Sequence, residues 1–422
     1  MKLAVVGGGS TYTPNLIDGL ARLRADLPLT EVVLIDPDER RLDLVAGVSR
    51  RILRRAGHSA RVTTSTEVEL GAAGADAVLI QLRVGGQTAR HQDETVPLEC
   101  GCVGQESVGA GGLATALRTV PVVLDLAERI ASVAPRPWFI DFTNPVGIVT
   151  RALLDAGHRA IGLCDVAIGL RRHFASLLGL EPERVSLDHV GLNHLTWERA
   201  VYVRGEDVLP RLLAEHGPSI AERVGLPESV LRRLGMVPSY YLRYFYEHDA
   251  VVAEQKVSPS RASVVAAVED ELLRQYADPT VDTKPDLLGS RGGAQYSEAA
   301  AALLASLFGD ARSADVHVVN VRNNGTLAFL PDTAVVEVPA TVTHTGAQTW
   351  PTAPIPPLLA GLIGHVSAYE TLAVRAAING GEDLVTEALL AHPLIGQVSV
   401  AEHLAARIIA VHQAHLPWAS VR

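Results

Sequence analysis

The first third of the chain alternates between short apolar runs and segments whose apolar residues recur at helical spacing. Residues 2–6 form an apolar run that leads into a glycine turn. A helical pattern follows from about Thr13, which we expect to be the N-cap, with Pro14 at the first helical position. A second apolar run at 32–35 ends in Asp36. Further strands are expected at 76–82, 137–142 and 159–163, with helices near 42–52, 119–134 and 146–156. This alternation predicts a parallel sheet covered by helices on both faces.

Beyond about residue 170 the pattern becomes mixed. Strand-like runs appear at 185–190, 316–321 and 334–338, and helical patterns appear at 260–277, 296–308, 357–378 and 400–414. No repeat, low-complexity tract or flexible linker separates this part from the first. We therefore expect two parts that share an interface with a cleft.

The glycine turn resembles a dinucleotide-binding loop. The segment Gly7-Gly8-Gly9-Ser10-Thr11-Tyr12 carries two of the three expected glycines, and Tyr12 stands at the third position. Gly7 permits the tight turn, and Gly9 lets the backbone approach a pyrophosphate at the helix N-terminus. Asp36, at the end of the next strand, can accept both ribose hydroxyls and would repel a 2′-phosphate, which favours NAD. A glycine turn that binds something else is the alternative.

These features predict an α/β chain with two domains. Residues 1–170 are expected to form a Rossmann-type NAD-binding domain with a parallel sheet, and residues 171–422 a mixed α+β domain for substrate, metal and oligomerisation.

Composition excludes some partners. The 422 residues carry a net charge of -10, which argues against nucleic acid. No apolar run looks long enough to span a bilayer, so no membrane partner is expected. The start does not read as a signal peptide, and the three cysteines are an odd number. Reduced thiols in the cytoplasm are therefore predicted. Separately, we expect the chain to form a homodimer or homotetramer, since most oligomers are symmetric assemblies of one chain.

Polar residues follow several predicted strands. Arg83 and Arg90 follow one, Asn144-Pro145 another, Cys164-Asp165 a third and Asn193-His194 a fourth. Taken singly, each has an ordinary structural explanation, such as a surface ion pair, a turn or a buried thiol. Together they predict a site, because strand ends meet at one crevice of an open α/β sheet.

Two further features leave their role open. Cys164 and His194 offer a metal two ligands, a half-filled shell that fits a catalytic ion better than a structural zinc. The aromatic segment 239–246 and the segment Arg291-Gly292-Gly293 could equally be a packed helix and an ordinary loop.

Taken in order, the motifs resemble family 4 of the glycoside hydrolases, and within it the 6-phospho-β-glucosidases. The resemblance covers nearly the whole length. It rests on Val6–Pro14, Gly104–Ser107, Phe142–Pro145, Gly162–Asp165, Gly191–His194, Tyr241–Tyr244, Arg291–Gly293 and Asn323–Gly325.

The resemblance implies a role for each matching residue. Cys164 and His194 would be the metal ligands, usually for Mn²⁺, and Tyr241 the base. Asp165 would donate a proton to the leaving group. Arg90, Asn144 and Arg291 would surround the sugar or its phosphate. The second domain would resemble that of lactate and malate dehydrogenases.

The implied reaction is hydrolysis of a 6-phospho-β-glucoside, such as cellobiose 6-phosphate or an aryl glucoside, to glucose 6-phosphate. It would proceed by NAD-dependent oxidation at C3, deprotonation at C2 and elimination, which avoids the usual pair of carboxylates. Asp165 after the cysteine is typical of the phospho-α-glucosidases, whereas the segment from Arg291 is β-like; we favour the β form. A simple NAD-dependent 2-hydroxy-acid dehydrogenase and a non-enzymatic sensor are the rival interpretations.

Overall fold

A computed structural model describes residues 1–291, 296–309 and 314–419. Within them one sheet of thirteen strands runs through the molecule. Its path order is β10-β8-β7-β12-β11-β6-β5-β4-β1-β2-β3, with β13 beside β12 and β9 beside β8. The strands are β1 (Lys2–Val6), β2 (Glu31–Ile35), β3 (Arg61–Ser65), β4 (Ala77–Ile80), β5 (Trp138–Asp141), β6 (Arg159–Gly162), β7 (Val185–Leu192), β8 (Leu195–Val203), β9 (Glu206–Asp207), β10 (Val237–Pro238), β11 (Asp315–Arg322), β12 (Val335–Thr343) and β13 (Gly346–Thr349).

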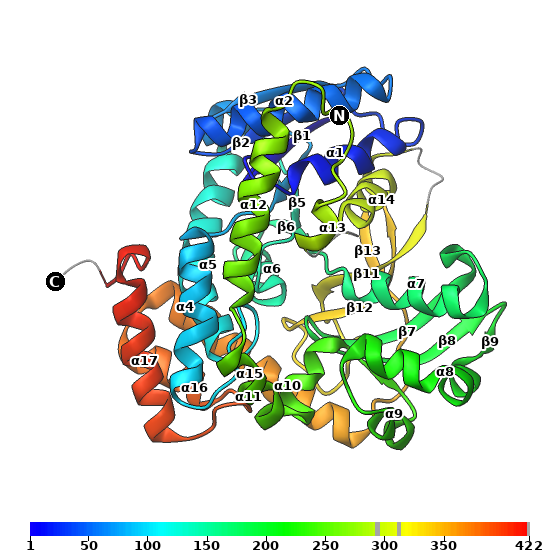
Figure 1. The fold of residues 1–422 in the computed structure, drawn as a ribbon, viewed down its shortest axis with the longest axis vertical. Helices are drawn as coiled ribbons and strands as arrows, with labels where there is room; N and C mark the ends of the chain where they lie inside the picture. Colours follow the sequence, from blue (N-terminus) through cyan, green and yellow to red (C-terminus); the bar gives the residue numbers. More distant parts are fainter. Residues whose placement is uncertain (292–295, 310–313, 420–422) are drawn as a thin grey trace.

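Helices cover this sheet on both faces (Figure 1). The α-helices are α1 (Thr13–Arg22), α2 (Glu39–Arg55), α3 (Val68–Ala72), α4 (Gly86–Glu99), α5 (Gly109–Val133), α6 (Val146–Asp155), α7 (Val166–Leu178), α8 (Leu209–Val224), α9 (Glu228–Leu234), α10 (Arg243–Tyr246), α11 (His248–Val257), α12 (Arg261–Ala277), α13 (Leu288–Arg291), α14 (Tyr296–Phe308), α15 (Pro357–Asn379), α16 (Glu382–Leu390) and α17 (Val398–His412). The 3₁₀ turns are η1 (Pro182–Arg184), η2 (Tyr240–Leu242) and η3 (Gln413–His415).

The N-terminal half of the sheet is parallel and confirms the predicted Rossmann-type fold. Strands β3-β2-β1-β4-β5-β6 pair in that order, which is the order of dinucleotide-binding domains. Apart from the edge strand β3, they contain apolar runs because helices bury both of their faces; Leu3, Ala4 and Val5 of β1, for example, are fully buried. The order reverses between β1 and β4, so a crevice forms at their carboxyl ends.

The C-terminal half continues the same sheet with antiparallel strands. β11 joins β6 through the pair Asn320 and Gly162, and β12 joins β7 through Glu337 and Gly191. β7 and β8 form a hairpin whose turn is Asn193-His194. The prediction of a mixed α+β part is therefore confirmed.

Helix α12 connects the two halves on one side of the molecule. In Figure 1 it descends from the region of α2 to that of α10 and α11, and it packs against both α2 and α4. Its N-terminus is capped by the Ser260 side chain and by Glu94 of α4, whose Oε2 accepts the Ala262 N–H at 2.8 Å. The cap ties α12 to the helix that carries Arg90.

One expectation from the sequence is wrong, namely that Thr13 is the N-cap of the first helix. Thr13 is the first helical residue and Tyr12 is the N-cap, because the Thr13 hydroxyl donates to the Gly8 carbonyl at 2.9 Å instead of capping.

Two helices, α5 and α15, are long and apolar enough to cross a membrane by length and composition. Their apolar windows are 72% and 44% buried inside the protein, and core helices pass the same test, so this is weak evidence for a membrane span.

Candidate active site

The glycine loop lies tightly against β2. Gly7 has φ +83°, and the N–H groups of Gly7 and Gly8 both donate to the Ile35 carbonyl at 2.9 Å. A Cβ on Gly8 would lie 2.7 Å from Leu34, so no side chain fits there. The Gly9 N–H donates to Asp36 Oδ2 at 3.1 Å. Burial raises the pKa of Asp36 despite this bond. The loop therefore presents its backbone and the following helix N-terminus to the crevice.

A cavity of about 1370 Å³ opens at this crevice. It brings together most of the residues that the sequence singled out from five strand ends and loops. The lining includes Gly7, Ser10, Asp36, Arg83, Arg90, Asn144, Asp165, Tyr241 and Arg291. Of the described residues, Cys164 and His194 are not among those that line this cavity. Both are buried, and His194 lies against the ring of Tyr241, which does line the cavity.

Tyr241 covers His194. The two rings stack with centroids 3.5 Å apart and planes 7° apart, and Tyr241 stands on η2, the 3₁₀ turn after β10. His194 Nδ1 is 2.9 Å from the Ser107 hydroxyl, and none of the described residues bonds its Nε2, which can therefore bind a ligand. Burial lowers the pKa of His194 to about 4, so its imidazole is neutral at physiological pH.

Cys164 and Asp165 form the turn from β6 into α7. The Cys164 thiol is buried, and burial together with the charges of Glu337 and Asp165 raises its pKa, whereas a hydrogen bond from Tyr296 opposes the rise. Burial raises the pKa of Asp165 to about 6. Burial also raises the pKa of Tyr241, and the Cys164 charge adds to the rise. Tyr241 is therefore close to both Cys164 and His194.

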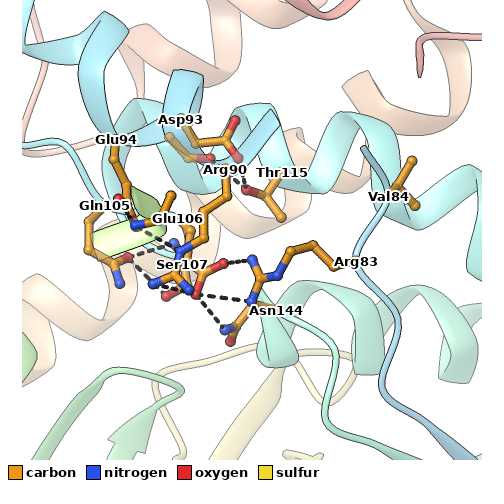
Figure 2. A network of polar contacts seen from close by, with 12 residues as sticks. Arg83, Val84, Arg90, Asp93, Glu94, Gln105, Glu106, Ser107, Thr115 and Asn144 are labelled. Atoms are coloured by element: carbon orange, nitrogen blue, oxygen red, sulfur yellow. Dashed lines mark hydrogen bonds and ion pairs between the residues drawn. The ribbon is translucent and has the colours of Figure 1, made fainter. Parts of the chain in front are cut away.

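Three cationic or amide side chains gather around Glu106 (Figure 2). Arg83 forms an ion pair with it, Arg90 Nη2 lies 3.2 Å from its Oε1, and Asn144 Nδ2 donates to the same oxygen at 3.5 Å. Burial and the charges of other arginines lower the pKa of Arg83 to about 9. The Asn144 Oδ1 atom is buried without a partner. This arrangement suits an anionic, hydroxyl-rich ligand.

Arg291 lies apart from that cluster, on the cofactor side of the same cavity. Its guanidinium donates to Glu269 Oε1 at 2.8 Å and lies 5.5 Å from the Tyr12 ring centroid. The Thr11 hydroxyl donates to the same Glu269 oxygen at 3.3 Å. The rest of its motif, residues 292–295, lies outside the described residues.

Sequence reasoning assigned no role to several residues that shape the site. Glu106 and Ser107 belong to a motif that was recognised without a function, and Glu269 and Glu337 were not singled out. Glu337 had a usable signal, since it interrupts the apolar run Val335-Val336-Glu337-Val338 in a strand.

The fold and the cavity define a Rossmann-type protein with a deep polar site at the switch point of its sheet. Residues 2–180 match the family described as "Family 4 glycosyl hydrolase", and residues 189–395 match "Family 4 glycosyl hydrolase C-terminal domain". The chain belongs to family 4 of the glycosyl hydrolases.

Its relatives fall into two groups of names. A 6-phospho-beta-glucosidase of Escherichia coli (strain K12) is 33% identical, covering 99% of this chain and 96% of the relative. A phospho-alpha-glucosidase of Clostridium acetobutylicum is 26% identical, covering 98% of each chain.

Solved structures agree with the fold. The 6-phospho-beta glucosidase of Thermotoga maritima, solved with manganese, NAD⁺ and glucose-6-phosphate, has a TM-score of 0.92 at 32% identity and covers 99% of each chain. Malate dehydrogenase from Salinibacter ruber shares the fold alone, with a TM-score of 0.53 at 15% identity over 90% of this chain and 97% of that one. The expected likeness to malate dehydrogenase is confirmed at the level of fold.

Proposed function

We propose that this chain hydrolyses 6-phospho-β-glucosides to glucose 6-phosphate with the help of NAD and a divalent cation such as Mn²⁺. The observation that carries the proposal is the stack of Tyr241 on His194 beside Cys164, at the wall of the cavity that also contains the glycine loop and Asp36. The proposed base and the dinucleotide loop thus line one cavity, and the two proposed metal ligands lie next to the base.

The residues at this site fit both the divalent cation and NAD. His194 is neutral and has Nε2 free, and Cys164 supplies a buried thiol, so the pair can ligate a borderline cation. The backbone of the glycine loop and the Asp36 carboxylate fit a pyrophosphate and a ribose without a 2′-phosphate.

When bound, NAD and the cation would supply reversible oxidation at sugar C3, polarisation of the resulting carbonyl, and the positive charge that makes Tyr241 acidic. Tyr241 then removes the C2 proton, which the neighbouring carbonyl has made acidic. Burial and the neighbouring Cys164, Tyr244 and Asp165 raise the pKa of Tyr241, and only Arg90 among the groups named there lowers it. The phenol therefore cannot act as a base without the added positive charge.

Other residues complete the reaction. Asp165, whose pKa of about 6 keeps part of it protonated near neutral pH, donates a proton to the leaving oxygen at C1. Arg90 and Asn144, oriented by Glu106, hold the sugar and its phosphate from one wall, and Arg291 holds it from the other. Water then adds at C1, C2 takes up a proton from solvent, and the hydride that C3 gave up would return to it, so the sugar shows no net oxidation.

The β preference is supported by the higher identity to the relative named for the β substrate, 33% against 26%. The α preference remains a second candidate because Asp165 follows Cys164 here. The aglycone, the cytoplasmic location, the oligomeric state and the domain boundary near residue 170 stay predictions.

Two measurements test the proposal. Turnover in deuterated water should place deuterium at C2 of the glucose 6-phosphate product, and a product without deuterium would contradict C2 deprotonation. Release of nitrophenol from the α- and β-nitrophenyl glucoside 6-phosphates, with NAD, Mn²⁺ and a thiol reductant, should be faster for the β form. Net accumulation of NADH with substrate would instead favour a simple dehydrogenase.

A further inference from the structure

A buried carboxylate stands behind the His194 turn. Glu337 lies on β12 and is 1% exposed. Its Oε2 accepts the side-chain amide of Asn193 at 2.8 Å and that of Asn320 at 2.9 Å, and its Oε1 lies 3.1 Å from His189 Nε2. Two strands, β7 and β11, and the β7–β8 turn thus send polar side chains to one carboxylate, which is costly to bury and is therefore hydrogen-bonded here.

His189 holds this carboxylate in its charged form. Its Nδ1 lies 2.7 Å from Glu198 Oε1, so the ring bridges two carboxylates in the protein interior. Burial lowers the pKa of His189, but Glu198 and Glu337 outweigh that effect and raise it to about 10. Two carboxylates around one imidazolium leave one negative charge behind the site.

The turn that carries His194 needs support. Asn193 and His194 alone connect β7 to β8, and His194 has φ +63°, a conformation that a residue with a side chain rarely adopts. Gly191, which lies in β7 two residues before Asn193, pairs with Glu337 of β12. A Cβ on Gly191 would lie 2.0 Å from the Leu195 carbonyl oxygen, so the hairpin is tight. The Asn193–Glu337 bond links this strained turn to the centre of the sheet.

The charge of Glu337 lies close to the ligand pair. Its Oε2 accepts the amide of Asn193, the residue next to His194, and its side chain is buried. A buried negative charge at this place attracts a cation.

We propose that Glu337 is a positioning residue that sets the affinity of the Cys164–His194 pair for a divalent cation. It fixes the His194 turn through Asn193, and it adds a buried negative charge behind the two ligands. The inference rests on the proposed function, because it requires the cation to bind at this pair.

The direct test is the Mn²⁺ dissociation constant of the NAD-loaded chain, measured from the EPR signal of free Mn²⁺. Glu337→Gln keeps the shape and an acceptor oxygen but removes the charge. We expect Mn²⁺ to bind about 10- to 100-fold more weakly in this variant. The NAD dissociation constant should stay within about twofold, since Glu337 touches no part of the glycine loop. If Glu337 had a purely structural role, its replacement would not weaken Mn²⁺ binding while leaving NAD binding unchanged.

Glu370→Gln is the matched control. Glu370 is also a buried glutamate and lines a small cavity beside His194, but burial raises its pKa to about 8, so it carries little charge at neutral pH. Its replacement should leave Mn²⁺ affinity unchanged. An equal loss in both variants would overturn the charge argument.

A second variant covers the case in which Glu337→Gln does not fold. Asn193→Ala removes the Asn193–Glu337 hydrogen bond at a half-buried turn position. This variant too should bind Mn²⁺ more weakly while it binds NAD normally. If Mn²⁺ binds within twofold of wild type in both folded variants, the role of Glu337 is wrong. If Mn²⁺ binds Cys164→Ser as tightly as wild type, the proposed function fails instead, because the cation is then held elsewhere.

Discussion

Tyr241 is the residue on which the proposed chemistry depends most directly. Tyr241→Phe removes the phenolic oxygen and keeps the ring that stacks on His194, so the fold and the glycine loop should be undisturbed. We expect kcat to fall by about 10²- to 10⁴-fold, the usual contribution of a positioned base, with NAD affinity unchanged. Nitrophenol release and NAD titration measure the two quantities.

The matched control for Tyr241 is Tyr202→Phe. Tyr202 lies on β8 with 37% of its surface exposed and is not among the residues that line the cavity. The Tyr202→Phe variant should have the same kcat as wild type. A Tyr241→Phe enzyme that retains a third or more of the wild-type rate would remove Tyr241 from its role as base.

Glu370 should make stability depend on pH. Burial raises its pKa from 4.5 to about 8, and its Oε2 has no partner in a cavity of about 30 Å³, room for one water. The folded chain keeps this proton while the unfolded chain releases it above about pH 4.5. The contribution is therefore fully present below that pH and is lost as the pH rises to about 8.

Urea unfolding between pH 5 and 8 checks this sign. The free energy of unfolding of Glu370→Gln, relative to wild type, should rise with pH, by roughly 5 kcal/mol at most across the window. A difference that stays constant over the whole range would show that Glu370 is ionised in the folded chain.

Part of the site was readable residue by residue. Asp36, Arg90, Asn144, Asp165 and Tyr241 were all expected, and all line one cavity. Strand ends and motif spacing carry that information locally. Glu269 and Glu337 escaped because their importance comes from partners far away in sequence, such as Arg291 and Asn193. No local pattern encodes such pairs.

At the scale of elements, α4 shows where the hydrophobic pattern misleads. The sequence analysis predicted no helix over Gly86–Glu99, because the residues that this helix buries include Arg90, Asp93 and Glu94. They are buried since each has an ionic or polar partner on another segment: Glu106, Arg118 and the α12 N-terminus, respectively. A charged inner face leaves no apolar periodicity. The long apolar helices α12 and α15, by contrast, were predicted within one residue at each end.

The pairing of α4 with α5 should be worth much more than an exposed ion pair. Arg118 and Asp93 are each 1% exposed at the side chain and are joined at 2.7 Å, and His412 of α17 lies 3.0 Å from the same carboxylate. Asp93→Ala leaves the Arg118 charge buried without its partner, which costs about 3–5 kcal/mol. Urea unfolding measures the loss.

Glu228→Ala provides the comparison for Asp93→Ala. Glu228 pairs with Arg232, whose side chain is 62% exposed, so removing it should change stability by less than about 1 kcal/mol. Equal losses in the two variants would show that burial does not decide the strength of these pairs.

At the scale of the whole molecule, the two halves share one sheet and most of the hydrophobic core. The largest apolar cluster contains residues from β1, β5, β8, β12, α15 and α17. The sequence predicted β1, β2, β4, β5 and β6 of the parallel half, because each contains an apolar run. It missed the edge strand β3, whose residues Arg61–Ser65 are mostly polar and partly exposed. It could not predict that β11 joins β6, since that junction depends on a single pair of distant residues, Asn320 and Gly162.

A shared sheet predicts that NAD stabilises both halves together. NAD binds the N-terminal half in our proposal, and at 100 times its dissociation constant it should add about 2.7 kcal/mol to the free energy of unfolding. Trp138 on β5 and Trp197 on β8 report on the two halves. In two variants, one with Trp138 and one with Trp197 as its only tryptophan, fluorescence should show the same urea midpoint as circular dichroism. NAD should shift all of these midpoints equally. The largest core cluster runs from β1 to β12, and the separate cluster in the C-terminal half, which includes Phe174, Leu212 and Val237, is much smaller. A shift confined to Trp138 would mean that the halves unfold independently and that the sheet does not couple them.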